Sequence, residues 1–146
     1  MLWFLRTTPA VSTTSTKTQV QILAPANQRV IIEYLAVHFQ GVVTTDAPIQ
    51  CELLIQTTAG TASALTINKH NPADDETLQT SAQETFTAEP TASTIKRRWF
   101  VHPQSSRVFI AQGEWAIPVP GGTRMAFRTV TPGVSVSTIV EMGLRE

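Results

Sequence analysis

The sequence is poor in cysteine, in charge and in long apolar runs, and each shortage excludes a class of protein. A single cysteine, Cys51, excludes an internal disulfide and a cluster of cysteine metal ligands. No apolar run approaches the ~18 residues of a membrane-spanning helix. Charged residues make up 15% of the chain, and eleven basic side chains cancel eleven acidic ones. Without a net positive field to hold a phosphate backbone, we expect no nucleic-acid partner.

The N-terminus lacks the features of a secretory signal peptide. Its apolar stretch, Leu2 to Leu5, is four residues long, and Arg6 ends it. A signal peptide has a basic start and a longer apolar segment. We therefore expect a protein that is synthesised in a cytoplasm and that enters no membrane.

The chain is rich in threonine, and its content of charged residues is low. The chain has 22 threonines and 9 serines among 146 residues, but only three lysines. Threonine is branched at the β carbon, so it packs well on a pleated sheet and loses rotamer freedom in a helix. The hydrophobic fraction of 42% is ordinary for a folded domain. Scaling of area with mass predicts a folded surface of roughly 7,400 Å². We expect one domain built of strands.

Hydrophobic periodicity predicts where these strands lie. The segment Ile49–Gln56 alternates apolar and polar residues, with Ile49, Cys51, Leu53 and Ile55 on the inward side. Proline and glycine recur every eight to fifteen residues between such segments, which is typical of a sandwich. The other expected strands are Gln19–Leu23, Arg29–Gln40, Ser63–Ile67, Gln83–Ala88, Thr94–Val101, Arg107–Ile110, Trp115–Val119, Thr123–Val130 and Val134–Met142. We predict an all-β fold: an antiparallel β-sandwich, most simply an eight-stranded jelly roll.

The first eighteen residues differ in composition from the rest of the chain. The segment Thr7–Thr18 is polar and rich in threonine and serine, which is typical of an extended linker. It follows the apolar quartet of residues 2–5, which is costly to leave exposed. We therefore divide the chain into an N-terminal arm and linker, residues 1–18, and a β-sandwich, residues 19–146. The quartet either folds back as an edge strand or docks on a neighbouring subunit.

No motif for catalysis stands out. The chain has no nucleophile elbow, no phosphate-binding loop and no pair of metal-binding histidines. Cys51 lies on an apolar face, where a free cysteine behaves as a small hydrophobe. The acidic run 74–76 lacks the spacing of a calcium loop. Glu33 and Glu52 could act as a glycosidase pair only if their strands were neighbours. We predict no enzyme, no catalytic residue, no metal ion and no cofactor.

The run Lys96–Phe100 (KRRWF) is the most concentrated feature of the sequence. On a strand, Arg97 and Trp99 share one face, while Arg98 lies on the other. The run could be a charged edge strand with Trp99 in the core, a protein interface, or a surface for single-stranded nucleic acid. Protein is favoured over nucleic acid. The predicted interface residues are therefore Leu2, Trp3, Phe4, Leu5, Arg97, Arg98 and Trp99.

Several segments are similar to those of small virion structural proteins of tailed bacteriophages. The likeness extends over nearly the whole chain and consists mostly of turn and loop sequences. Its segments are 16–29 (TKTQVQILAPANQR), 54–65 (LIQTTAGTASAL), 86–91 (FTAEPT), 101–104 (VHPQ) and 118–122 (PVPGG). The resemblance implies a jelly-roll or β-sandwich subunit, and some members of this class decorate capsids as cement proteins.

The resemblance also implies a function. We expect a non-enzymatic protein of the virion that binds the outer surface of a phage capsid and reinforces it. Its partners would be the major capsid protein and further copies of itself, with a trimer preferred because symmetric oligomers dominate such assemblies. Two alternatives stay open. The chain could be a tail or neck component, or a β-sandwich module that binds a glycan or a receptor.

Overall fold

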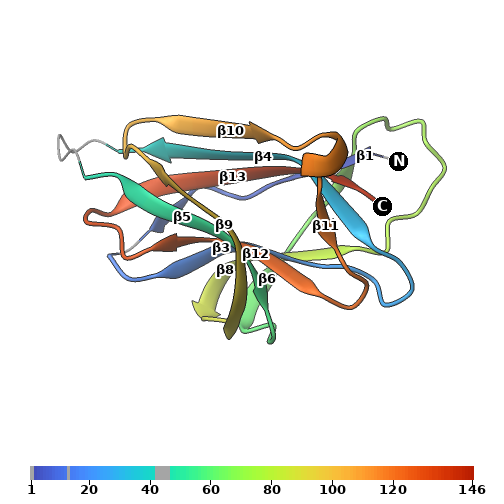
Figure 1. Ribbon diagram of the computed structural model, residues 1–146, viewed down its shortest axis with the longest axis horizontal. Helices are drawn as coiled ribbons and strands as arrows, with labels where there is room; N and C mark the ends of the chain where they lie inside the picture. Colours follow the sequence, from blue (N-terminus) through green and yellow to red (C-terminus); the bar gives the residue numbers. More distant parts are fainter. Residues whose placement is uncertain (1, 13, 42–46) are drawn as a thin grey trace.

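Two antiparallel sheets make up the protein in the computed structural model, which describes residues 2–12, 14–41 and 47–146 (Figure 1). The prediction of an all-β, antiparallel β-sandwich is confirmed. The accessible surface of 7382 Å² agrees with the area expected for one folded domain of this mass. Met1 and Thr13, which belong to the predicted arm, lie outside the described residues.

The strands fall into two sheets. The first sheet has the order β10-β4-β13-β1-β7, and β11 and β2 add to it on β4 and β13. Its strands are β1 (Leu2–Arg6), β2 (Ala10–Ser12), β4 (Val30–Gln40), β7 (Asn68–Lys69), β10 (Ser106–Ile110), β11 (Ile117–Val119) and β13 (Val136–Arg145). The second sheet has the order β6-β8-β3-β12-β5-β9. Its strands are β3 (Lys17–Leu23), β5 (Ile49–Gln56), β6 (Thr61–Leu65), β8 (Ser81–Ala88), β9 (Ala92–Val101) and β12 (Arg124–Val130).

The strand order follows a jelly roll. The chain passes repeatedly between the sheets, and this gives the neighbours β1-β13-β4-β10 in one sheet and β3-β12-β5-β9 in the other. The described residues form thirteen strands rather than eight, because β2, β6, β7, β8 and β11 add to the eight strands of this pattern. All ten segments that we expected to be strands are strands, within three residues at each end. A short 3₁₀ helix, Gly113–Trp115, takes up the first residue of the expected strand Trp115–Val119, so β11 begins at Ile117.

The core lies between the sheets, where the inward side chains of both meet. Phe127, Leu53 and Met142 are almost wholly buried there. The alternation in β5 is confirmed for Ile49, Cys51 and Leu53, all of which are buried. A sandwich whose inward positions alternate with outward ones has this pattern on each strand.

The second sheet is also buried on its outward side, which its sequence pattern does not predict. Gln56, which the alternation of Ile49–Gln56 places on the outward side, is buried and donates to Thr18 Oγ1 (2.9 Å), while Gln21 donates to Gln56 Oε1 (2.7 Å). Glu52 is 1% exposed and accepts from Arg98 Nε (2.9 Å) and Arg128 Nε (2.7 Å). These three side chains, Gln21, Gln56 and Glu52, thus have hydrogen-bond partners, and this satisfies the condition for their burial.

The two arginines determine the charge state of Glu52. Burial by itself would raise the pKa of the carboxyl, but hydrogen bonds and charges from Arg128 and Arg98 outweigh it. The pKa of Glu52 is therefore lowered from its usual value. The arginines lie on β12 and β9, which flank β5, so the carboxylate ties three neighbouring strands together.

The N-terminal segment is part of the sandwich rather than a separate arm. Strand β1 pairs with β13 from Leu2 opposite Arg145 to Arg6 opposite Glu141. Trp3 is 4% exposed and Leu5 is 0% exposed, and both belong to the core. Of the two alternatives that the sequence leaves open, the structure shows the folded-back strand, because these two side chains fill the core. Strand β2 also pairs with β13, so both strands of the predicted arm belong to the first sheet. Residue 18 therefore marks no boundary between an arm and the sandwich.

We expect Leu5→Ala to lower the free energy of unfolding by about 2–5 kcal/mol, the cost of a large-to-small change in a packed core. Phe4→Ala, one residue away on the exposed side of β1, should change it by less than about 1 kcal/mol. Urea denaturation followed by tryptophan fluorescence measures both. Equal effects of the two variants would contradict the placement of β1.

Removal of the Glu52 carboxylate should reduce stability in a pH-dependent way. The folded-state pKa is lower than the unfolded value, so the stabilisation is present above about pH 4.3 and is lost as the pH falls through the folded pKa. We expect Glu52→Gln to cost about 2–3 kcal/mol at neutral pH, the usual range for hydrogen bonds to a charged group, and less at pH 3.

The matched control is Glu33→Gln, which removes a half-exposed ion pair to Arg145 and should cost less than about 1 kcal/mol. Thermal unfolding across the pH range compares the variants. A loss from Glu52→Gln that is the same at pH 3 as at pH 7 would argue against this role for the carboxylate.

Candidate functional site

Exposed apolar side chains gather on the outward side of the first sheet. Leu2 (37% exposed), Phe4 (41%), Val108 (50%) and Ile110 (63%) all lie there, and they are four of the seven large exposed hydrophobics in the described ranges. The register explains the grouping, because Phe4 lies opposite Gly143, which lies opposite Tyr34, which lies opposite Ile110. We call Leu2, Phe4, Tyr34, Val108 and Ile110 the apolar face.

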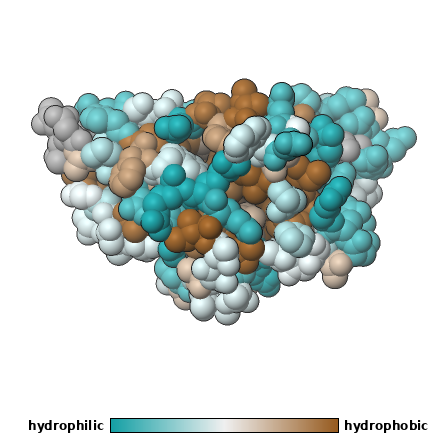
Figure 2. Space-filling model, in the orientation of Figure 1, coloured by the Kyte–Doolittle hydropathy of each residue, from teal (hydrophilic) through white to brown (hydrophobic). Residues whose placement is uncertain are grey.

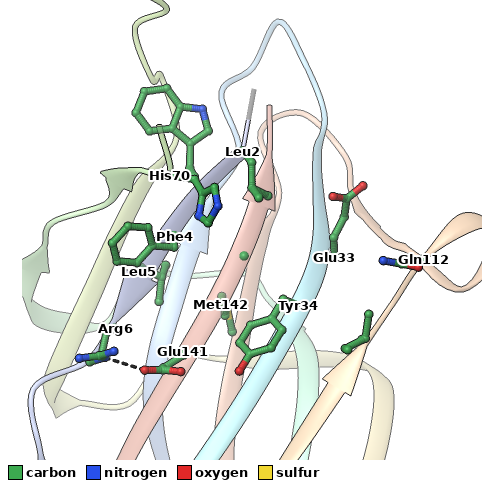
Figure 3. Close-up of a pocket in the computed structure, with 13 residues that line it drawn as sticks. Leu2, Phe4, Leu5, Arg6, Glu33, Tyr34, His70, Gln112, Glu141 and Met142 are labelled. Atoms are coloured by element: carbon green, nitrogen blue, oxygen red, sulfur yellow. Dashed lines mark hydrogen bonds and ion pairs between the residues drawn. The ribbon is translucent and has the colours of Figure 1, made fainter. Parts of the chain in front are cut away.

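A hollow of about 510 Å³ opens in the middle of the apolar face (Figure 3). Phe4 and Leu2 lie on one side of it and Tyr34 on the other. Gly143 forms part of its floor: a Cβ atom there would lie 3.0 Å from Tyr34 Cβ. A side chain at position 143 would therefore crowd Tyr34.

The charges on this side of the sheet are paired with one another. Arg6 Nε donates to Glu141 Oε1 at 2.6 Å, and Figure 3 shows this contact at the lower edge of the hollow. Arg145 Nη2 lies 2.9 Å from Glu33 Oε1. Two cations and two carboxylates cancel, so the surface around the apolar face has little net charge. Such a surface can meet another copy of itself without charge repulsion.

A second feature is a basic groove between the edges of the two sheets. It has a volume of about 270 Å³, and we call it the β9–β10 groove. Figure 2 shows hydrophilic residues over β9 beside hydrophobic ones towards β10. The lining residues are Lys96, Arg97, Arg98, Trp99, Arg107 and Phe109.

Trp99 joins the groove to the core. Its ring lies 5.7 Å from that of Phe127, and its indole Nε1 is buried without a hydrogen-bond partner in the part of the chain that the structure describes. Arg97 lies on the same side of β9, opposite Leu53. Arg98 lies on the other side, where it binds Glu52.

The structure thus separates the seven residues predicted as an interface. Leu2 and Phe4 lie on the apolar face, and Trp3 and Leu5 lie in the core. Arg97, Arg98 and Trp99 line the β9–β10 groove. Sequence reasoning missed Tyr34, Val108 and Ile110 as surface residues. Alternation in 107–110 places Val108 and Ile110 on one face, but only the pairing of β10 with β4 shows that this face is outward.

The groups considered for catalysis lie apart from one another. Glu33 is in the first sheet and Glu52 in the second, so the strands of the possible carboxylate pair are not neighbours. Cys51 is fully buried, and burial raises the pKa of its thiol to about 12. Within residues 2–12, 14–41 and 47–146, no three His, Cys, Asp or Glu side chains cluster so that they could hold a metal ion.

The same described residues include no helix that is long and apolar enough to cross a membrane.

Comparisons with protein-family models, with curated proteins and with solved structures found no match for the chain. A function for this chain is therefore inferred from the apolar face and the β9–β10 groove.

The Cys51 thiol should be inert in the native protein. With a pKa of about 12, roughly one thiol in 10⁴ is ionised at pH 8, and the side chain is also out of solvent. We expect a disulfide reagent such as Ellman's to react with the chain only after it is unfolded in guanidinium. If the folded protein reacts as fast as the unfolded one, the prediction is wrong and Cys51 could act as a nucleophile.

Proposed function

We propose that this chain is a non-enzymatic structural protein of a phage virion, which binds the outer surface of the capsid and reinforces it. The observation that carries the structural, self-assembling part of the proposal is the apolar face, an uncovered patch on a sheet whose surrounding charges are already paired. Large exposed apolar patches are typical of surfaces that bind other proteins. The phage-like turn segments support the choice of virion.

Self-association fits the apolar face best. Its apolar residues come from β1, β4 and β10, so the patch is held by paired strands rather than by loops. The hollow beside Gly143 could take a side chain of a neighbouring copy, because shape complementarity at interfaces depends on such fitting. We propose that copies assemble through this face, as a trimer about a three-fold axis.

The capsid would then be bound by a different part of the molecule. The β9–β10 groove and the apolar face share β10, but Arg107 and Phe109 lie on the opposite side of that strand from Val108 and Ile110, so both surfaces could be used in the oligomer. A low content of charge also favours dense packing among neighbours, because few ions have to lose their water.

The experiment places a charge on the apolar face. We expect Ile110→Lys to convert oligomers into monomers in sedimentation velocity, because an ammonium group would have to be buried at the interface. Phe100→Lys is the matched control, since Phe100 is similarly exposed (57%) but belongs to the second sheet. It should leave the oligomer intact. A wild-type protein that sediments as a monomer at all concentrations would contradict self-association.

Binding to the virion is tested by labelling. Antibody labelling of intact particles of the phage that encodes the chain should mark the whole head, and shells that lack the protein should break at lower temperature. Label confined to the tail or neck would contradict the capsid function and support the tail alternative.

One observation favours the glycan-binding alternative. Trp115 is 69% exposed, and flat exposed aromatic side chains can stack on sugar rings. The guanidinium carbon of Arg97 lies 5.8 Å from the ring centre, within the range of a cation–π contact. A glycan array on which Trp115→Ala loses a binding signal of the wild-type protein would support this alternative, and an array without any signal would exclude it.

A further inference from the structure

The β9–β10 groove gathers positive charge in a chain that has none overall. Of eleven basic residues, four (Lys96, Arg97, Arg98 and Arg107) line this one groove, and none of its lining residues is acidic. Seven basic and eleven acidic side chains remain for the rest of the molecule. The protein is therefore electrostatically polar, with its positive end at the groove.

Most of this charge has no carboxylate partner. Arg98 is the exception, because it shares the buried Glu52 with Arg128. No carboxylate of the described residues pairs with Lys96, Arg97 or Arg107. Arg98 and Arg128 together carry two positive charges and Glu52 carries one negative charge, so this cluster has a net charge of +1. It therefore adds to the positive potential of the groove.

Arg97 is held ready for a ligand. Its guanidinium carbon lies 4.7 Å from the ring centre of Phe109. Its Nη2 atom donates to the backbone oxygen of Trp115 at 3.4 Å. The other N–H groups of this guanidinium have no partner among the described residues. An arginine fixed on aromatic rings binds a carboxylate at a lower entropic cost than a mobile one.

The backbone around the groove also offers hydrogen bonds. β9 ends the second sheet and β10 ends the first, so each has one edge that pairs with no described strand. An extended peptide can add to such an edge through its main chain, with side-chain contacts providing specificity. Basic residues on an edge strand also hinder pairing between identical edges, because like charges repel. An acidic strand would meet no such repulsion.

We propose that the β9–β10 groove binds an extended, acidic segment of a partner protein, with carboxylates on Arg97, Arg107 and Lys96. This inference rests on the proposed function, in which the partner is the capsid, and it specifies the chemistry of the partner's segment. Carboxylates suit the groove better than a nucleic-acid backbone does, because the chain as a whole has no net charge to attract a polyanion.

The test uses the isolated, full-length protein and a fluorescein-labelled decapeptide of alternating glutamate and threonine. We expect saturable binding at low ionic strength by fluorescence anisotropy, and no binding of the peptide in which glutamine replaces glutamate. Arg97→Gln should weaken binding about ten-fold or more, the usual effect of removing a charged hydrogen-bond donor. Arg107→Gln should also weaken it, and this exposed residue can be replaced without disturbing the core.

The matched control is Arg29→Gln, which removes an equally exposed arginine outside the groove and should leave the affinity unchanged. The inference is overturned if the wild type does not bind the glutamate peptide or if Arg29→Gln weakens binding as much as Arg107→Gln. Tighter binding of a labelled oligothymidylate would assign the groove to nucleic acid instead. Loss of self-association in Arg97→Gln would assign it to a second copy of the chain.

These outcomes are separable from those for the proposed function. Peptide binding is measured without particles, so unlabelled virions together with intact peptide binding would refute the capsid function and leave the groove's specificity in place. Labelled capsids together with absent peptide binding would refute the groove inference alone.

Discussion

The pairing of β1 with β13 is the interaction on which both the core and the apolar face depend. It joins the two ends of the chain, since Leu2 lies opposite Arg145. Inward, it places Trp3 and Leu5 among the core side chains. Outward, it brings Phe4 next to Gly143, so β1 contributes both to the core and to one side of the hollow. Folding and surface formation are thereby coupled.

The outward sides of the two sheets differ in their chemistry. Where the first sheet leaves apolar residues exposed, the second covers its central strands with polar groups that bind one another, around Glu52 and Gln56. A carboxylate that accepts from arginines on two neighbouring strands is stabilised as an anion, and it fixes those strands relative to each other. One face is thus closed by internal hydrogen bonds, and the other is open to association.

The groove and the apolar face differ in the chemistry that they offer. The apolar face has paired charges and a shaped hollow, which suits contact between identical subunits. The β9–β10 groove has unpaired cations and free strand edges, which suits an unlike, acidic partner. A subunit that must bind both its own copies and a different protein needs two such surfaces. In the proposed function both surfaces could be used at once, because they lie on opposite sides of β10.

The sequence by itself determined the strands and the sandwich, because alternation of apolar residues is local and is visible in segments such as Ile49–Gln56. It also placed Arg97 and Trp99 on one side of β9. Only the tertiary structure decided which strands are neighbours, and so which alternating side is exposed. Val108 and Ile110 are outward, while Leu5 is buried, because β10 pairs with β4 and β1 with β13. Such pairings join residues far apart in the chain, and no local pattern specifies them.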